Sequence, residues 1–209
     1  MTAPPNPAVK LALKAMAARD GKALSGLRIA DQGCGKLRHY RVLAPLARQL
    51  YLVDTDVQLT TPHVDGRRTF TIEEFAEKER EKGSLEVRLL RDDEFERSSL
   101  GLDCVFSIAV FDVVLPDVRF SLISAARRNL KRGGWFVVII PRNDSSILAR
   151  CAKKNEHRDG HLFSHHGIHT FYRNFLDTDP VVTWCRTRGL ELIKDLSRYH
   201  QACLLFAKA

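Results

Sequence analysis

Short apolar runs alternate with amphipathic runs along this chain, and that alternation limits the folds open to it. Seven runs are compact and apolar, and we predict them to be strands: 27–31, 50–54, 85–90, 102–110, 135–140, 190–195 and 202–209. Five segments have helical spacing: 7–19, 38–50, 72–83, 119–134 and 180–189. This order predicts an α/β fold, in which helices cover both faces of a mostly parallel seven-stranded sheet in three layers.

Several predicted helices carry boundary signals. Thr71 and Glu74 fit a capping box, and Gly83 is placed to end the helix that they begin. Pro45 could kink the segment 38–50, because proline cannot donate a helical hydrogen bond. The glycine pair at 133–134 is expected to close another helix before a strand that is buried on both faces.

The chain as a whole is typical of one globular domain. Its 209 residues suffice for a hydrophobic core, and no repeat or low-complexity linker divides them, so we expect a single domain, 1–209. No apolar run approaches the roughly 20 residues of a membrane span. Lys10 and Lys14 interrupt the apolar start, which is not expected to be a secretory signal. Five cysteines without CxxC spacing predict reduced thiols and a cytoplasmic location.

Polar residues and glycines gather where the predicted strands end. In sheets of this kind, ligands bind beyond the carboxyl ends of the strands, at the point where strand order reverses. We therefore expect one crevice to contain Asp31, Gly33, Gly35, Asp54, Asp92, Asp93, Ser107, Asp112, Arg142 and Asn143.

The residues at the ends of the first two predicted strands limit which ligands could bind there. Gly33 and Gly35 have no Cβ, so the backbone can turn tightly and a ligand can lie against it. Asp54 can accept two hydrogen bonds from a ribose diol, and Asp31 can face a cationic group. A dinucleotide loop would have a third glycine where this chain has Arg38. A ligand with a ribose, a positive charge and no phosphate fits better, and S-adenosylmethionine has these features.

Five motifs in order resemble class I S-adenosylmethionine-dependent methyltransferases, whose fold is Rossmann-like. They are ADQGCGKL (30–37), LVDTD (52–56), RLLRDDEF (88–95), LDCVFSIAVFDVVLPD (102–117) and RRNLKRGGWFVVIIPR (127–142). The resemblance covers roughly residues 25–142, and the closing segment 180–209 also fits it.

The resemblance implies a set of cofactor-binding residues: Asp31, Gly33, Gly35, Asp54, Thr55, Asp92, Asp93 and Ser107. By it, Gly33 and Gly35 line the methionine moiety and Asp54 holds the ribose. Either Asp92 or Asp93 contacts the adenine amino group.

The sequence also departs from the family pattern. Leu37 stands where many members have a third glycine. The region of Ser107 should border the transferring methyl, yet SIAV stands there in place of N/D-P-P-Y/F, which weakens an amino-methylating DNA enzyme. No Pro-Cys pair stands there either, which weakens a cytosine-C5 enzyme; Cys104 is expected to be buried within its strand.

Structural explanations compete with these functional ones. Asp31 could be a helix N-cap, Asp54 a plain loop acid, and the pair 92–93 solvated loop acids. Asp112 is predicted to be a helix cap or surface acid, and Cys34 to be a small loop residue rather than a nucleophile.

A histidine-rich insertion is predicted at about 143–178, where the family often builds its acceptor lid. It holds five of the eight histidines, at 157, 161, 165, 166 and 169. Gly160 and Gly167 argue against one continuous helix. His161 and His165 are our candidates for acceptor-binding or acid–base residues; ordinary polar lid residues are the alternative. A metal site with Glu156 and Asp159, loosely resembling that of small-RNA-end methyltransferases, is disfavoured, so no metal is expected.

Charge points to an anionic acceptor. The formal net charge is +8, and residues 119–160 hold ten Lys/Arg against three acids. The acceptor could be a small anion or a nucleic acid, whereas a solvated basic face would explain the same residues. Two other functions compete: a catalytically silent binding module for nucleic acid or a protein partner, which the intact 31–54 motif disfavours, and a nicotinamide-dependent oxidoreductase, which Arg38 disfavours.

Overall fold

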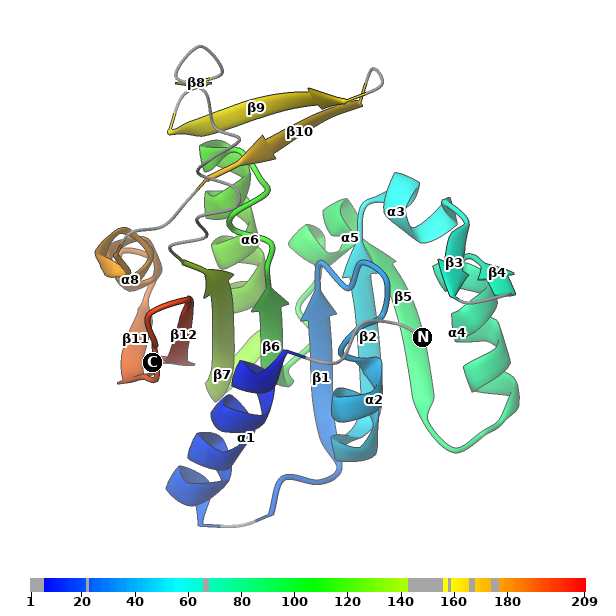
Figure 1. Cartoon of the computed structure of the whole chain (residues 1–209). Coiled ribbons are helices and arrows are strands. Elements are labelled where there is room, and N and C mark those ends of the chain that lie inside the picture. Colours follow the sequence, from blue (N-terminus) through cyan, green and yellow to red (C-terminus); the bar gives the residue numbers. More distant parts are fainter. Residues whose placement is uncertain are drawn as a thin grey trace.

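A seven-stranded sheet forms the centre of the computed structural model, which describes residues 6–21, 23–65, 68–142, 156–157, 159–165, 168–173 and 177–209 (Figure 1). The strands lie in the order β11-β12-β7-β6-β1-β2-β5. Their bounds are β1 Leu27–Gln32, β2 Ala47–Asp54, β5 Glu86–Arg91, β6 Leu102–Ile108, β7 Leu130–Pro141, β11 Leu190–Asp195 and β12 Gln201–Lys208. Only β12 runs antiparallel to its neighbours β7 and β11 in this sheet. The predicted fold class is therefore confirmed.

Helices cover both faces of this sheet, because its strands are apolar on both sides. Successive strand residues enter different core clusters: Ile29 lies in the first and Ala30 in the second. The first cluster includes residues of α1 (Pro7–Asp20), α2 (Tyr40–Leu43) and α4 (Ile72–Glu81). The second includes residues of α5 (Asp92–Arg97), α6 (Pro116–Asn129) and α8 (Asp179–Arg186). No helix in the described part of the chain has both the length and the apolar composition that a membrane span needs.

Two small sheets accompany the central one. The hairpin of β3 (His63–Asp65) and β4 (Arg68–Phe70) follows the short helix α3 (Asp56–Thr60). Within the histidine-rich segment, β8 (Glu156–His157), β9 (Gly160–His165) and β10 (Ile168–Tyr172) form an antiparallel sheet in the order β10-β9-β8. Figure 1 shows β9 and β10 beyond the carboxyl ends of β6 and β7.

Several predicted elements have different bounds, and one predicted helix is wrong. The segment 38–50 contains only α2 and a 3₁₀ turn, Ala44–Leu46, before β2 begins at Ala47. Pro45 lies inside that turn, where its missing N–H and fixed φ disfavour a longer α-helix. The capping box at Thr71 is confirmed.

The boundary after α6 also differs from the prediction. The helix ends at Asn129 because Leu130 is already extended (φ −71°, ψ 141°). The glycine pair 133–134 therefore lies within β7 and does not close the helix. The buried part of β7, from Trp135 to Ile140, confirms a strand covered on both faces.

Candidate active site

Three neighbouring strands bring the predicted site residues to one edge of the sheet. Asp31 lies near the end of β1, in register with Phe106 of β6 and Leu52 of β2. Ser107 is the next residue of β6, and Asp54 is the last residue of β2. We call the group of Asp31, Gly33, Gly35, Asp54 and Ser107 the cofactor crevice.

The loop after β1 is held tightly against the end of β2. The backbone N–H groups of Gly33 and Cys34 both donate to the carbonyl oxygen of Val53, at 2.8 and 3.1 Å. The N–H of Gly35 donates to Oδ2 of Asp54 at 2.8 Å. Gly33 has φ +78°, and a Cβ placed on it would lie 2.3 Å from Cγ2 of Val110. Glycine is thus required at 33 both by conformation and by space.

Leu37 is one of two described non-glycine residues with positive φ, at 57°. It adopts the left-handed conformation that a glycine takes most easily, at the position where the resembled family often has one. Its side chain is 7% exposed and belongs to the first core cluster, and this burial offsets the backbone strain. The backbone at Leu37 therefore turns as a glycine would, although the family pattern often has a glycine here.

Asp31 is a buried carboxylate without a partner. Its side chain is 1% exposed, and neither oxygen has a hydrogen-bond partner among the described residues. Burial, and secondly the charge of Asp54, raise the pKa of Asp31 to about 7. Ser107 is fully buried, and its Oγ also has no partner within the described part of the chain. Such groups are rare in folded proteins, and a cationic ligand with N–H donors would satisfy Asp31.

Asp54 faces the same edge but is only partly buried. Its two oxygens accept hydrogen bonds from the N–H groups of Gly35 and Thr55, at 2.8 and 2.9 Å. Burial raises its pKa, although these two bonds act to lower it. Each carboxylate oxygen retains a further acceptor site, so a ribose diol could bind here. Thr55 caps α3, its Oγ1 accepting from the N–H of Gln58 at 3.3 Å.

Asp92 and Asp93 occupy different environments. Both lie in the first turn of α5, so the competing explanation of the pair as loop acids is wrong. Asp93 forms an ion pair with Arg97 at 2.6 Å, whereas the charge of Asp92 contributes to the raised pKa of Asp54. Asp92 is therefore the acid that lies closer to the end of β2.

Comparisons with known proteins agree with this geometry at the level of fold. No protein-family model and no curated protein matches the sequence. Among solved structures, the 1,6-didemethyltoxoflavin-N1-methyltransferase of Burkholderia thailandensis, with bound 1,6-didemethyltoxoflavin and S-adenosylhomocysteine, has a TM-score of 0.62 at 15% identity. The alignment covers 97% of this chain and 79% of that one.

Two more solved structures have the same fold. Magnesium protoporphyrin IX methyltransferase of Synechocystis, with bound S-adenosylhomocysteine, has a TM-score of 0.59 at 13% identity, covering 97% of this chain and 84% of that one. An S-adenosylmethionine-dependent methyltransferase of Clostridium acetobutylicum has a TM-score of 0.63 at 13% identity, with 94% and 89% covered. This chain has the class I methyltransferase fold.

In this class I methyltransferase fold, the loop after β6 holds an acid that sequence analysis misjudged. Asp112 is not a helix cap or a surface acid: it is 3% exposed, and α6 begins only at Pro116 after its cap residue Leu115. Burial raises the pKa of Asp112 to about 6, and its Oδ1 has no partner among the described residues. The apolar residues on both sides of it, FDVVL, were the signal for burial.

The insertion is anchored beside that loop by a charged cluster. Arg119 of α6 is fully buried; its Nε donates to the carbonyl oxygen of Phe111 at 2.7 Å, and its guanidinium pairs with Asp159. Asp159 also pairs with Arg173, whose backbone N–H donates to the carbonyl oxygen of Asp112 at 2.7 Å. These contacts hold the described part of the insertion over the carboxyl end of β6.

The predicted histidines are described only in part. His161 lies in β9, and its Nδ1 is buried without a partner among the described residues. The backbone of His165 lies in the same strand, but its side chain is outside the described part of the structure, as are His166 and the crevice candidate Asn143. No three His, Cys, Asp or Glu residues gather as a metal site within the described ranges.

Proposed function

We propose that this protein is a methyltransferase that uses S-adenosylmethionine. The observation that carries the proposal is the buried, unpartnered carboxylate of Asp31 beside a glycine loop that is closed onto Asp54. A module that bound only nucleic acid or a protein partner would have no need of such a group, since an unsatisfied buried polar atom costs about 1–3 kcal/mol.

The residues of the cofactor crevice fit the parts of this cofactor. Asp31 would face the positively charged methionine end, against the bare backbone at Gly33 and Gly35. Asp54 would accept from the ribose hydroxyls, and Asp92, rather than Asp93, would contact the adenine. Thr55 remains a proposed neighbour of the ribose, and Ser107 of the reacting methyl.

Catalysis in such a site is mainly alignment. S-adenosylmethionine supplies, when bound, a methyl group that is already activated on a sulfonium. The chain has to hold the acceptor in line, which can contribute about 7–11 kcal/mol. If the acceptor must lose a proton, His161 and Asp112 are candidate bases, because both hold a buried nitrogen or oxygen without a partner in the described part of the chain. His165 remains a candidate base because its backbone lies in β9, the strand that contains His161.

The acceptor is proposed to be an anion, either a small molecule or a nucleic acid. Of the basic residues that suggest this, Arg127, Arg128, Lys131 and Arg132 are exposed, but they lie at the end of α6 and the start of β7, at the edge of the sheet opposite the cofactor crevice, and so do not support it. Lys131 is paired with Asp103 at 2.5 Å, so part of this charge is already neutralised. The segment 143–178 is proposed to act as the lid over this acceptor within a single domain, 1–209.

The cysteines support the proposed cytoplasmic location. Four of them are free and buried: Cys34, Cys104, Cys185 and Cys203. Burial, followed by the charges of Asp31 and Asp54, raises the pKa of Cys34 well above its usual value, so a nucleophilic role is disfavoured.

Three measurements test the proposal. Calorimetry should show binding of S-adenosylhomocysteine at micromolar levels and none of NAD; binding of NAD alone would overturn the cofactor. A screen with labelled cofactor against RNA, DNA, protein and metabolite pools should then identify the acceptor. His161→Ala should lower methyl transfer and leave cofactor affinity near wild type, whereas unchanged transfer would leave it an ordinary lid residue.

A further inference from the structure

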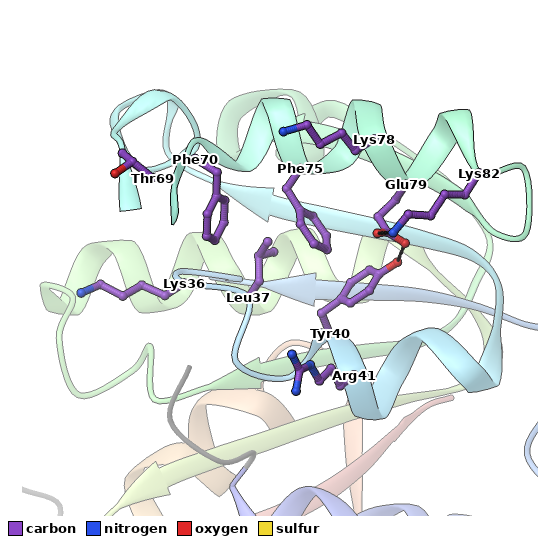
Figure 2. A pocket seen from close by; sticks show the side chains of 10 residues that line it. All are labelled: Lys36, Leu37, Tyr40, Arg41, Thr69, Phe70, Phe75, Lys78, Glu79 and Lys82. Atoms are coloured by element: carbon purple, nitrogen blue, oxygen red, sulfur yellow. Dashed lines mark hydrogen bonds and ion pairs between the residues drawn. The ribbon is translucent and has the colours of Figure 1, made fainter. Parts of the chain in front are cut away.

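A hollow lies next to the cofactor crevice, between α2 and α4. It has a volume of about 560 Å³, which is within the range of small-molecule sites. We call it the basic groove, and Figure 2 shows its lining residues: Lys36, Leu37, Tyr40, Arg41, Thr69, Phe70, Phe75, Lys78, Glu79 and Lys82. It exists because the helix after the glycine loop is only four residues long, so α4 has a short neighbour.

The walls of the groove are aromatic. Tyr40 and Phe75 face each other from α2 and α4, with ring centroids 4.8 Å apart and planes at 88°. Phe70, from the hairpin, lies 6.2 Å from Phe75. All three rings are only partly buried, and Figure 2 shows Phe70, Phe75 and Leu37 projecting into the same space. A flat, apolar group could pack here against ring surface.

The charges around these rings are not balanced. Four of the lining residues are cations and one, Glu79, is an acid. Glu79 is already engaged, because it pairs with Lys82 and accepts from the hydroxyl of Tyr40 at 2.7 Å. Although burial acts to raise it, the pKa of Glu79 is lowered by these two contacts, so it remains a carboxylate.

Three cations are therefore left over. Lys36, Arg41 and Lys78 are exposed, and none of their side chains has an ion-pair or hydrogen-bond partner within the described part of the chain. Figure 2 shows them at separate points around the aromatic side chains. A ligand that combines a flat ring with a negative charge would satisfy both features at once.

We propose that the basic groove binds a nucleotide unit, with its base against the aromatic walls and its phosphate among Lys36, Arg41 and Lys78. The unit could be a free nucleotide or part of a nucleic-acid strand, since both present a base beside a phosphate. This site is separate from the cofactor crevice: it takes an anion, whereas the crevice presents carboxylates. It touches the same loop through Lys36 and Leu37.

The test is calorimetry with uridine 5′-monophosphate on protein saturated with S-adenosylhomocysteine. A pyrimidine is used because it lacks the adenine that the crevice would hold. Uridine 5′-monophosphate should bind at least about tenfold more tightly than uridine or inorganic phosphate alone, because only it carries both parts. Equal binding of all three, or none at about 1 mM, would overturn the proposal.

Charge-reversal variants locate the binding. Lys36→Glu/Lys78→Glu should weaken it by about tenfold or more. Lys10→Glu/Lys14→Glu is the matched control, because it reverses two exposed lysines of α1 and should change affinity less than about twofold. Equal loss in both variants would mean nonspecific attraction and would overturn the groove. Arg41→Ala provides a second, milder variant should the first fold poorly.

Further experiments distinguish a free nucleotide from a nucleic-acid strand, and a failure of the groove proposal from a failure of the proposed function. A ten-nucleotide RNA that binds more tightly than the monomer, with affinity falling steeply in salt, would assign a strand; equal affinity would assign the free nucleotide. Binding of S-adenosylhomocysteine without uridine 5′-monophosphate would overturn the groove alone, and the reverse would overturn the proposed function alone.

Discussion

The cofactor crevice and the basic groove share one loop but have opposite character. Gly33 and Gly35 belong to the crevice, where polar groups are buried. Its main feature is the unpartnered carboxylate of Asp31. Lys36 and Leu37 belong to the groove, where the charged groups are cationic and exposed. Burial makes each charge in the crevice matter more, because a low-dielectric site strengthens electrostatic interactions. Changes in the crevice should therefore have large effects and changes in the groove small ones.

The largest effect is expected from Gly33→Ala. The new Cβ would need a left-handed backbone, which costs about 1–2 kcal/mol, and would also meet Val110 at 2.3 Å. We expect the free energy of unfolding to fall by about 2–5 kcal/mol and methyl transfer to fall on the order of a hundredfold. Urea denaturation and single-turnover assays measure the two effects.

Gly83→Ala is the matched control for this change. Its φ is similar, +66°, but nothing lies within 4 Å of the added Cβ, so it isolates the backbone strain. Gly33→Ala/Val110→Ala should recover part of the stability, because it removes the close contact. If Gly33→Ala and Gly83→Ala behaved alike in stability and cofactor affinity, the tight loop would not be a cofactor cradle.

Asp31→Asn should make the ligand-free protein more stable, although it removes the carboxylate that is proposed to bind the cofactor. The native pKa of about 7 lies above the ordinary 3.8, so the folded state holds a proton that the unfolded state has lost between these values. Stability of the wild type therefore falls as pH rises from about 4 to 7. At pH 8 the variant should be more stable by about 2–4 kcal/mol, and at pH 4 the difference should vanish.

Cofactor affinity of the wild type should change with pH in the opposite direction from its stability. S-adenosylhomocysteine lacks the sulfonium charge but keeps the α-ammonium of the amino-acid end, which favours the ionised carboxylate of Asp31. Its affinity should therefore drop by up to about tenfold per pH unit below 7 and level off above it. Calorimetry at pH 5, 6, 7 and 8 measures this, and Asp31→Asn should flatten the profile. A variant that is less stable than the wild type at pH 8 would contradict the unpartnered carboxylate.

Asp54→Ala should have a smaller effect on affinity, since Asp54 is less buried. Loss of charged hydrogen-bond acceptors should weaken binding of S-adenosylhomocysteine by about 1.5–3 kcal/mol. Asp56→Ala is a suitable control, because Asp56 is exposed nearby and pairs with Arg91 at 2.8 Å. Similar losses in both variants would assign the effect to general charge at this edge rather than to the ribose.

The same contrast explains what sequence analysis could predict. The crevice depends on residues that are close in sequence, such as Asp31 and Gly33, and on the rule that parallel strands end together. The groove depends on the short α2, which was wrongly predicted as a long helix, and on a hairpin that periodicity did not reveal. Its lysines therefore resembled ordinary solvated positions of amphipathic segments.

Asp112 shows a second limit. Its neighbours in sequence are apolar, yet the charge of Arg119 acts on it, and its carbonyl oxygen accepts from the N–H of Arg173, which lies in the insertion some sixty residues later. No spacing rule connects two such positions. Contacts of this kind, between a loop and an insertion, follow from tertiary packing and not from local pattern.

The smallest expected effect tests the charge balance of the groove. Glu79→Gln keeps an oxygen that can accept from Tyr40 but removes the charge that holds Lys82. A partly solvated pair of this kind contributes about 0–1 kcal/mol, so affinity for uridine 5′-monophosphate should rise only about two- to fivefold. Because the gain is electrostatic, it should shrink as salt rises from about 0.05 to 0.5 M. Glu81→Gln, an exposed acid of the same helix outside the groove, should leave affinity unchanged, and neither variant should alter binding of S-adenosylhomocysteine. A fall in nucleotide affinity with Glu79→Gln would mean that the groove prefers cations, and the opposition between the two regions would then be wrong.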